Sequence, residues 1–568
     1  MTSGGAPGGY DGATGATGAT GGAAVHGGSA PVVVVGAGIS GLAAAWELRR
    51  AGVAVVLLEA GDRVGGVMAR GALDVPGRDE PLVVDLGPES LLARRPEALE
   101  VLDELGLSGD VVHPEPVPAA VATRGALHDL PPGTVMGVPR TTAHLDGLLS
   151  PQEVARVAAE ERVEPVGADD VDVASWVAGR VGRAVVDRLV EPLLGGVYAG
   201  SAGSLSLRAT VPALWDLAER GEPLLPGGSG RPGAPTTAGA PTSAGAPTSA
   251  GVPTSAGAPT TAGVPTPAGA PAAGPVFAGL RGGVGRLAEE LAARLVREGA
   301  DLRLRTPATS LRRADRASLE GVDRTARWVV GTPGGDVRAR SVVVALPAPA
   351  AARLLRSVAP GAAAELGRVR TASSAIATLV VPGAVLAGVR RSGVLVPPVD
   401  GGVVKASTFS STKWRWLADA AAAGARPDGA SAGGASAGGA PAVLRVSAGR
   451  AGEEAVLDRD DGDLLLVAAA ELGALLGGGA LPVLSGRVVR WRDGLPQYDV
   501  GHLDLVARAR ADVAAQPGLA VAGSVYEGVG VPACLASGRR AARRLLAGGA
   551  AGSEAGSAPS RRPGSMGA

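Results

Sequence analysis

The sequence predicts a mixed α/β and α+β protein whose first folded segment is a β–α–β unit. Residues 31–35 form a short β-branched run, a glycine-rich turn and a helical pattern through Arg50 follow it, and a second strand ends at Glu59. Further strand patterns occur at residues 302–305, 328–330, 341–346 and 519–522. A helix is expected to begin near Pro532, where a proline costs no helical hydrogen bond. Strand and helix patterns therefore alternate along the folded parts of the chain.

Four low-complexity segments separate these folded parts. They are an N-terminal tail (1–30), a linker (213–275), a spacer (421–441) and a C-terminal tail (549–568). Within the linker, a hexapeptide such as GAPTSA runs seven times between residues 233 and 274. Each unit carries a proline and none carries a large apolar residue, which favours a flexible, partly extended linker over a folded β-helix. The remainder is long enough for two or three domains.

The composition excludes several classes of function. The formal net charge is +0, so no basic surface points to a nucleic acid partner. The single cysteine, Cys534, excludes an internal disulfide and a cysteine metal cluster, and no metal site is expected. No segment reaches the roughly 18–20 continuous apolar residues of a membrane span, and the first residues lack the pattern of a signal peptide. We therefore expect a cytoplasmic protein.

The first turn has the pattern of a nucleotide-binding loop. It consists of Gly36, Ala37, Gly38, Ile39, Ser40 and Gly41. Gly36 permits the tight turn, Gly38 lets the backbone approach a pyrophosphate, and Gly41 lets helix and strand pack closely. The positive end of the following helix then faces the phosphates. Glu59, 18 residues after Gly41, is placed to accept hydrogen bonds from ribose hydroxyls.

A second motif follows this unit. Arg63, Val64, Gly65 and Gly66 form an RxGG sequence four residues after Glu59. At this place the motif is typical of flavin-binding rather than nicotinamide-binding versions of the unit. It lets the chain turn back over the pyrophosphate of FAD. A chance match to the glycine pattern alone is common in a glycine-rich chain, so the second motif carries much of the prediction.

Several later segments resemble the protoporphyrinogen oxidase family. They lie at 85–107, 127–139, 188–212, 393–414, 495–502 (LPQYDVGH) and 522–542 (AGSVYEGVGVPACLASGRRAA). The likeness runs in order over nearly everything except the low-complexity segments, and it is greatest to the actinobacterial branch that acts on coproporphyrinogen III. The C-terminal block is not shared by amine oxidases or phytoene desaturases. The chain is therefore identified as resembling this family.

The resemblance implies a discontinuous Rossmann-like FAD-binding domain made of residues 31–110, 276–350 and 486–548. Residues 111–212 and 351–485 then form a mixed-sheet substrate domain with a helical insertion. In the family, the helical part often lies on a membrane, so contact with a membrane surface stays open as an alternative to a purely cytoplasmic location.

The resemblance also assigns residues to the cofactor. Those implied to hold FAD, besides residues 36–41 and Glu59, are Ala60, Gly66, Val67, Gly87, Pro88, Glu89, Ser90, Ala308, Trp491, Val529, Gly530 and Val531. The last three open the final helix, whose dipole can stabilise negative charge on a reduced flavin. Two positions depart from the family pattern. Glu89 is an acid where some eukaryotic relatives have arginine, and Arg124 is only a weak match to the family's propionate-holding arginine.

The implied reaction removes six electrons from a porphyrinogen, with FAD as the acceptor and O2 as the final oxidant, giving hydrogen peroxide. Because coproporphyrinogen carries four propionates, Lys405, Lys413 and Arg450 are candidate substrate cations, although lysine and arginine side chains are more often solvated surface charges. Other side chains could pack the core or serve the site. These are Tyr198, Trp414, Trp416 and Tyr526. For His502 a structural hydrogen bond is favoured over catalysis, and for Cys534 a buried thiol over a covalent flavin anchor.

Three other functions stay open. The substrate could be protoporphyrinogen IX. A flavin amine oxidase or carotenoid desaturase would share the N-terminal unit but not the later segments. An FAD-binding scaffold without catalysis, with the hexapeptide repeats recruiting partners, is the most distant alternative.

Overall fold

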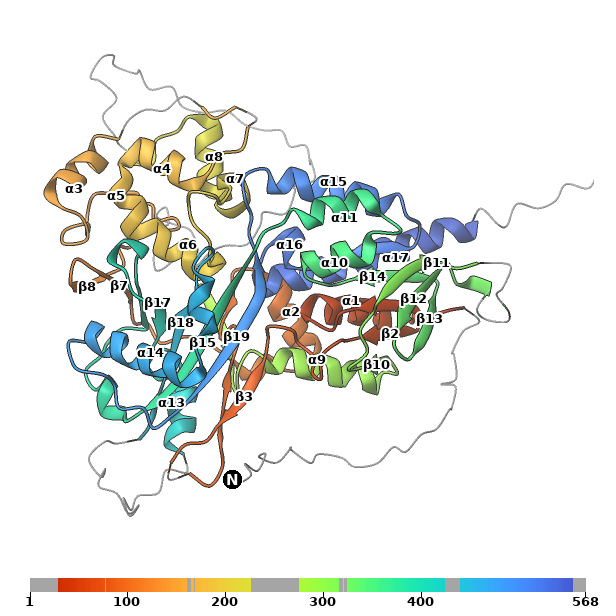
Figure 1. Cartoon of the computed structure of the whole chain (residues 1–568), viewed down its shortest axis with the longest axis horizontal. Coiled ribbons are helices and arrows are strands. Elements are labelled where there is room, and N and C mark those ends of the chain that lie inside the picture. The colour runs from red at the N-terminus through yellow and green to blue at the C-terminus, as the bar shows by residue number, and fades with distance from the viewer. Residues whose placement is uncertain are drawn as a thin grey trace, which may run out of the picture.

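The computed structural model describes residues 29–76, 78–160, 165–167, 169–225, 275–315, 320, 324–423 and 440–554. The chain forms two lobes that lie side by side, and the long strands β15 (Thr371–Val381) and β19 (Ser485–Pro496) run close to the junction between them (Figure 1). The hexapeptide tract, most of the spacer and most of both expected tails lie outside the described residues.

The first lobe is built on a five-stranded parallel sheet. Its strands, in spatial order, are β10 (Asp301–Arg303), β2 (Val55–Leu58), β1 (Val32–Val35), β14 (Ser341–Val344) and β20 (Leu519–Val521). The central strand β1 consists of four valines, and all four are buried. A strand covered on both faces reads as a continuous apolar run rather than an alternating one. The three segments expected to share this sheet do so, although they are hundreds of residues apart.

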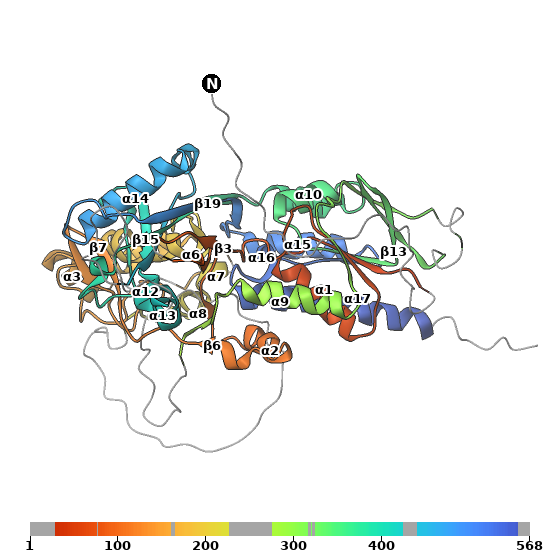
Figure 2. The ribbon, with the colours of Figure 1, turned by 90° about the horizontal axis from the view of Figure 1, so that it is seen from below.

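Helices cover both faces of this sheet (Figure 2). One face carries α1 (Ile39–Arg50), α2 (Pro96–Glu104), α9 (Arg286–Arg297) and α17 (Val531–Glu554). The other face carries α10 (Ala348–Leu355), α11 (Pro360–Gly367), α15 (His502–Ala514) and an antiparallel sheet of β11 (Ser310–Arg313), β12 (Trp328–Thr332) and β13 (Gly335–Ala339). Val32 and Val34 join the first core, and Val33 and Val35 join the second, as the two-residue period of a strand requires.

The second lobe is built on a seven-stranded mixed sheet. Its order is β19, β15, β18 (Ala442–Ala448), β17 (Val404–Thr408), β16 (Gly393–Leu395), β7 (Ala119–Thr123) and β8 (Ala126–Asp129). Only the β16–β7 pair is parallel among these pairings. Helix α14 (Asp461–Leu475) lies across one face, where Leu464, Ala468 and Leu472 join the sheet's core (Figure 2).

A helical part packs against the opposite face of this sheet. It comprises α3 (Pro151–Ala158), α4 (Val173–Val181), α5 (Arg183–Val185), α6 (Glu191–Tyr198), α7 (Leu207–Thr210) and α8 (Pro212–Arg220). Leu395 of β16 packs into the core of these helices, whereas its neighbours Val394 and Val396 face α14. Among the described residues, no helix is long and apolar enough to cross a membrane.

Short elements connect the lobes. They are β3 (Arg70–Leu73) paired with β4 (Leu82–Asp85), a sheet of β5 (Leu91–Leu92), β9 (Phe277–Leu280) and β6 (Val111–Val112), and the helices α12 (Ser410–Lys413), α13 (Arg415–Ala422) and α16 (Ser524–Glu527).

The structure moves three of the expected domain boundaries. The low-complexity linker was expected to begin at residue 213, but residues 212–220 form α8, whose apolar side chains are buried in the core of the helical part. Residues 486–496 were expected in the FAD-binding domain, but β19 is hydrogen-bonded to β15 in the seven-stranded sheet. Residues from 351 onward were expected in the substrate domain, but α10 and α11 pack on the five-stranded sheet. The physical reason is that a strand or helix joins whichever edge or face is open to it, and the order of elements along the chain does not show which one that is.

Candidate functional site

The glycine turn after β1 divides into two structural glycines and one open glycine. Gly36 has φ +99°, and a Cβ there would lie 2.5 Å from the carbonyl oxygen of Ala345. A Cβ on Gly41 would lie 1.8 Å from the carbonyl oxygen of Gly36. At Gly38 an added Cβ meets no atom within 4 Å. The first two glycines are therefore required by the fold, and the third leaves its backbone open to a ligand.

Glu59 is held at the end of β2, beside this turn. Its Oε2 accepts a hydrogen bond from the backbone N–H of Ala37 at 2.8 Å, and its Oε1 accepts one from Gly61 at 2.8 Å. The carboxylate is only half-buried and the next residue, Ala60, is exposed. The backbone N–H of Thr306 donates to the Glu59 carbonyl at 2.7 Å, which brings the segment that contains Ala308 close to this acid.

The RxGG segment folds back over the turn. The N–H of Gly65 donates to the carbonyl of Ala37 at 2.8 Å, and both Gly65 (φ +93°) and Gly66 (φ +60°) adopt left-handed backbone conformations. Val67 follows with 42% of its surface exposed, which is unusual for a valine inside a folded lobe. A Cβ on Gly87 would lie 1.7 Å from the Val67 carbonyl oxygen, so this second expected segment touches the first.

The last expected segment reaches the same place. Residues 529 and 530 precede α17, whose first residue Val531 packs in the core that contains Ile39, and Cys534 lies against Ser40. Two helix N-termini, those of α1 and α17, therefore open beside each other. Trp491 of β19 donates from Nε1 to the carbonyl of Leu86 at 3.2 Å, with the guanidinium of Arg63 5.6 Å from its ring centre.

These residues fit a dinucleotide flavin. The open backbone at Gly38 and the N-terminus of α1 suit a pyrophosphate, and the accessible acid suits a ribose. The N-terminus of α17 supplies a positive dipole end for the charge that a reduced flavin develops. The glycine turn, the RxGG segment and the start of the final helix were predicted from the sequence to form one site, and the structure places these three segments beside one another.

Glu89 lies in a buried ion network between the lobes. Its carboxylate accepts hydrogen bonds from Ser410 Oγ at 2.8 Å, Lys413 Nζ at 3.0 Å, Trp414 Nε1 at 3.1 Å and Arg445 Nη1 at 3.1 Å. Burial by itself would raise the pKa of Glu89, but the charges of Lys413 and Arg445 lower it to about 2. The carboxylate is therefore ionised, and each of its two oxygens accepts two hydrogen bonds from protein side chains.

This network bears on two of the expected roles. We expected Lys413 to meet a substrate carboxylate, and its ammonium is paired with Glu89 inside the protein. We expected the 87–90 segment to pass the cofactor, and the Glu89 side chain points from this segment toward Lys413 and Arg445. Arg445 also donates to the carbonyl of Gly87, so the network fixes the 87–90 segment rather than touching a ligand through Glu89. Trp414 is buried in the core, as its structural interpretation predicts.

Asp85, at the end of β4, was not predicted as a site residue. Its two carboxylate oxygens accept hydrogen bonds from the N–H groups of Val284 at 2.8 Å and Gly285 at 2.9 Å, just before α9. Burial raises the pKa of Asp85 to about 6, and the two backbone hydrogen bonds oppose that rise. The residue ties the end of β4 to the residues that open α9, two segments of the first lobe about 200 residues apart in the sequence. The available signal was an acid at the end of a strand directly before the Leu-Gly-Pro-Glu sequence.

Three aromatic rings lie together beside α16, just before the start of α17. Tyr198 and Tyr498 have ring centres 5.7 Å apart, and Tyr498 stacks on His502 at 3.9 Å. His502 Nε2 lies 2.8 Å from the carbonyl of Val525, and burial lowers the pKa of His502 to about 4. A neutral, buried, hydrogen-bonded histidine agrees with the structural interpretation. Burial likewise raises the pKa of Cys534 to about 11, which describes an unreactive thiol.

The remaining candidates divide between surface and interior. The guanidinium of Arg124, in the turn between β7 and β8, pairs with Glu153 of α3 at 2.6 Å, and both side chains are about one-third exposed. Lys405 and Arg450 are both buried, in the substrate lobe. The hydroxyl of Tyr526 is buried without a hydrogen-bond partner in the described part of the chain.

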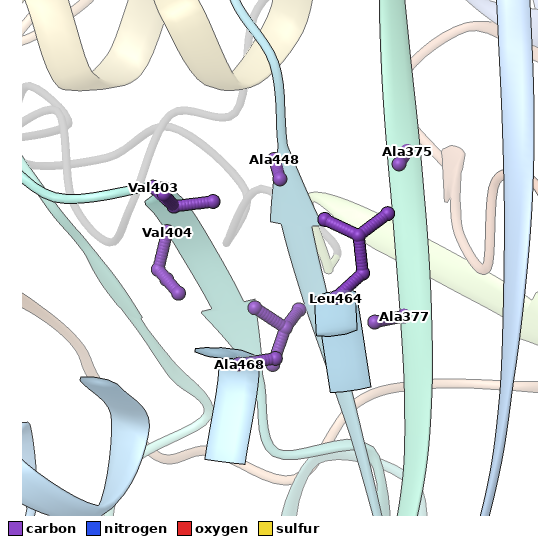
Figure 3. Close-up of a pocket in the computed structure, with 8 residues that line it drawn as sticks. Ala375, Ala377, Val403, Val404, Ala448, Leu464 and Ala468 are labelled. Carbon is purple, nitrogen blue, oxygen red and sulfur yellow. The ribbon is translucent and has the colours of Figure 1, made fainter. Parts of the chain in front are cut away.

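A small cavity beneath α14 is not a ligand site. It measures about 10 Å³ and is enclosed by β15, β17, β18 and α14, with Ala375, Val404, Ala448, Leu464 and Ala468 among its lining residues (Figure 3). The lining side chains are all apolar and the space holds at most one water molecule. We interpret it as imperfect packing.

Comparisons with known proteins agree with this geometry. Residues 39–546 match the family model described as flavin containing amine oxidoreductase. The chain is 37% identical to a coproporphyrinogen III oxidase of Mycobacterium leprae, over 90% of this chain and 98% of that protein. It is 34% identical to a coproporphyrinogen III oxidase of Propionibacterium freudenreichii, over 91% of this chain and 90% of that protein.

Solved structures show the same architecture. A crystal structure from Exiguobacterium assigned to protoporphyrinogen oxidase superimposes with a TM-score of 0.69 at 27% identity, covering 91% of this chain and 98% of that one. Putrescine oxidase with bound putrescine superimposes with a TM-score of 0.58 at 17% identity, which reflects the shared fold alone.

Fold, site and comparisons together define a flavin-dependent oxidase. This confirms the mixed α/β and α+β fold class and the flavin cofactor that the glycine turn and RxGG motif predicted. Within the flavin-containing amine oxidoreductases, the chain belongs to the protoporphyrinogen and coproporphyrinogen oxidase family. The resemblance read from the later sequence segments is therefore correct.

Proposed function

We propose that this enzyme binds FAD and oxidises coproporphyrinogen III to coproporphyrin III with O2 as electron acceptor. The observation that carries the substrate assignment is the full-length similarity to the mycobacterial proteins, since the chain covers 98% of the Mycobacterium leprae coproporphyrinogen III oxidase. Both lobes and the helical part are included in that match. The 28% identity to protoporphyrinogen oxidase of Bos taurus makes protoporphyrinogen IX the competing substrate.

The choice of FAD rests on the adenosine half of the site. Glu59 stands at the end of β2 with a half-exposed carboxylate, and the backbone at Gly38 is open. FMN has neither an adenosine ribose for this acid nor a pyrophosphate for this turn. The segment around Ala308, which lies close to Glu59, would border the adenine.

The chemistry requires little from acid–base side chains. FAD held there would supply the two-electron chemistry of each of three oxidation cycles, with three O2 reduced to three H2O2 per porphyrin. Protein residues bind and orient the reactants. The N-terminus of α17 faces developing negative charge, and the Glu89 network fixes the 87–90 segment. His502 is unsuited to proton transfer at neutral pH because burial favours its neutral ring and the hydrogen bond to Val525 fixes the orientation of that ring.

The proposal is tested by spectra and turnover of the purified protein. We expect a yellow protein that releases FAD on denaturation, and coproporphyrin fluorescence when coproporphyrinogen III is added in air. Three equivalents of H2O2 should appear per porphyrin. A preference for protoporphyrinogen IX of tenfold or more in kcat/KM, about 1.4 kcal/mol in the transition state, would assign the other substrate. Turnover of amines with no turnover of either porphyrinogen would reject the proposal.

A further inference from the structure

Lys405 is a buried cation without a partner. It lies on β17, where the pairing with β18 shifts register between Val404 and Ala406, a β-bulge of the kind that re-aims a side chain. The residue is only 5% exposed. Within the described part of the chain, its ammonium makes no hydrogen bond and has no carboxylate within 4.0 Å. Burying an ammonium group without a partner is costly, so such a residue needs an explanation.

The nearest charge to Lys405 is a second buried cation. Arg450, 8% exposed, follows β18, and burial together with its positive charge lowers the pKa of Lys405 to about 8. Arg450 pairs with Glu453 at 3.2 Å, but the Glu453 side chain is 56% exposed to solvent. It also donates from Nη2 to the carbonyl of Val396 at 3.1 Å. Arg450 therefore has one solvent-screened carboxylate partner, and Lys405 has none.

Other buried cations in the described residues are neutralised differently. Arg180 has Glu160, with a side chain 6% exposed, at 3.6 Å. Arg445 has Glu89, with a side chain 11% exposed, at 3.1 Å. Arg539 has Glu104 at 2.6 Å and two further carboxylates within 4.0 Å. The protein therefore supplies a sheltered carboxylate to its buried cations, and the Lys405–Arg450 pair is the exception.

The pair lies at the junction of the seven-stranded sheet with α6. Both residues contact Val396: the backbone carbonyl of Lys405 accepts from the N–H of Val396 at 2.9 Å, and the guanidinium of Arg450 donates to the Val396 carbonyl. The preceding residue, Leu395, packs against the core that contains Tyr198, and Val529, just before α17, packs against the same core. The N–H of Ala451 donates to the carbonyl of Ala199, at the end of α6, at 2.7 Å. The pair therefore borders the core that separates it from the start of α17.

We propose that Lys405 and Arg450 form a subsite that binds one carboxylate of the substrate. A carboxylate placed between them would complete the missing neutralisation, with the planar guanidinium able to bind it through two parallel hydrogen bonds. The class of ligand is a carboxylate-bearing substrate. Its identification as a porphyrinogen propionate rests on the proposed function.

The chain offers a direct probe of this subsite because it contains two lysines, Lys405 and Lys413. Protein labelled with ¹⁵N-lysine therefore has two side-chain ammonium groups to follow by NMR. We expect the pKa of Lys405 to rise when the stable product coproporphyrin III binds. Lys413, already paired with Glu89, is the internal control and should not respond. A Lys405 resonance that titrates identically with and without coproporphyrin III would refute the subsite.

Variants provide a second measurement. Lys405→Met should weaken coproporphyrin III binding by ten- to a hundredfold, while binding of its tetramethyl ester should stay within twofold of wild type. Because the substitution removes an uncompensated buried charge, the variant should be at least as resistant to urea as wild type. Lys413→Met, the matched control, should lose stability because it removes a partner of Glu89. Equal loss of affinity for acid and ester would show that Lys405 only shapes the lobe.

The outcomes separate this inference from the proposed function. If wild type neither binds nor oxidises any porphyrin compound, the proposed function fails. Benzoate then replaces coproporphyrin III as the probe. A benzoate-dependent rise in the pKa of Lys405 would support the subsite for a different carboxylate substrate, and no response to benzoate would reject it.

Discussion

Replacing Gly38 with alanine should weaken flavin binding strongly while leaving the protein folded. The backbone at Gly38 has φ −65° and ψ 171°, which any residue adopts, and an added Cβ would meet no protein atom within 4 Å. Alanine restricts the unfolded chain but is a poorer N-cap than glycine, two effects of up to about 1 kcal/mol each with opposite sign. The free energy of unfolding of the flavin-free protein should therefore change by less than about 1 kcal/mol.

The cost appears when the ligand binds. The added methyl group occupies the space through which a pyrophosphate approaches the backbone, so one or two charge-assisted hydrogen bonds are lost, each worth about 1.5–3 kcal/mol. A loss of about 3 kcal/mol corresponds to a Kd for FAD raised by about a hundredfold or more. The larger Gly38→Val should lose binding altogether.

The assay is titration of flavin-free protein with FAD, followed by flavin fluorescence, beside urea unfolding of the same samples. Two variants calibrate it. Gly179→Ala adds a Cβ in open space on α4 and should change neither affinity nor fold, whereas Gly41→Ala places a Cβ 1.8 Å from the Gly36 oxygen and should fail to fold. Wild-type affinity in Gly38→Ala would refute the assignment of the turn. So would a Gly38→Ala protein that is unfolded without flavin, since the backbone there would then be structural.

Three further predictions concern buried ionisable groups. Glu89→Gln leaves Lys413 and Arg445 without their buried carboxylate and should lower the free energy of unfolding by about 3–5 kcal/mol in urea at pH 7.5; a loss under 1 kcal/mol would contradict the network. Asp85→Asn can accept only one of the two backbone hydrogen bonds and should cost about 1–3 kcal/mol in the same measurement, and an unchanged midpoint would count against its linking role. Finally, His502 is protonated near pH 6.5 in the unfolded chain, whereas the folded protein keeps it neutral down to about pH 4. The contribution of this neutral histidine to the free energy of unfolding is therefore complete above pH 6.5 and is lost as the pH falls toward 4. Relative to His502→Gln, wild type should lose about 3 kcal/mol between pH 7 and pH 4, and parallel pH profiles of the two proteins would disprove this.

The geometry of the glycine turn and of its acid could be predicted from the sequence because its determinants are local. Gly36, Gly38, Gly41 and Glu59 lie within one β–α–β unit, where chain geometry alone fixes how a turn, a strand end and a helix N-terminus meet. The strands at 341–346 and 519–522 were also recognisable. Each is a short run of small and β-branched residues that a parallel sheet can bury on both faces.

The partners of charged side chains were decided only by the tertiary structure. Lys405 and Lys413 are eight residues apart and looked equivalent in the sequence, yet Lys413 meets Glu89, 324 residues away, while Lys405 is buried beside Arg450. Asp85 and Arg445 went unrecognised because their roles depend on backbone and carboxylate groups brought in from other segments. A local motif carries its own geometry, whereas the neutralisation of a buried charge depends on long-range packing. The sequence by itself therefore determined the glycine turn and its neighbouring acid, and long-range packing determined which buried charges have partners.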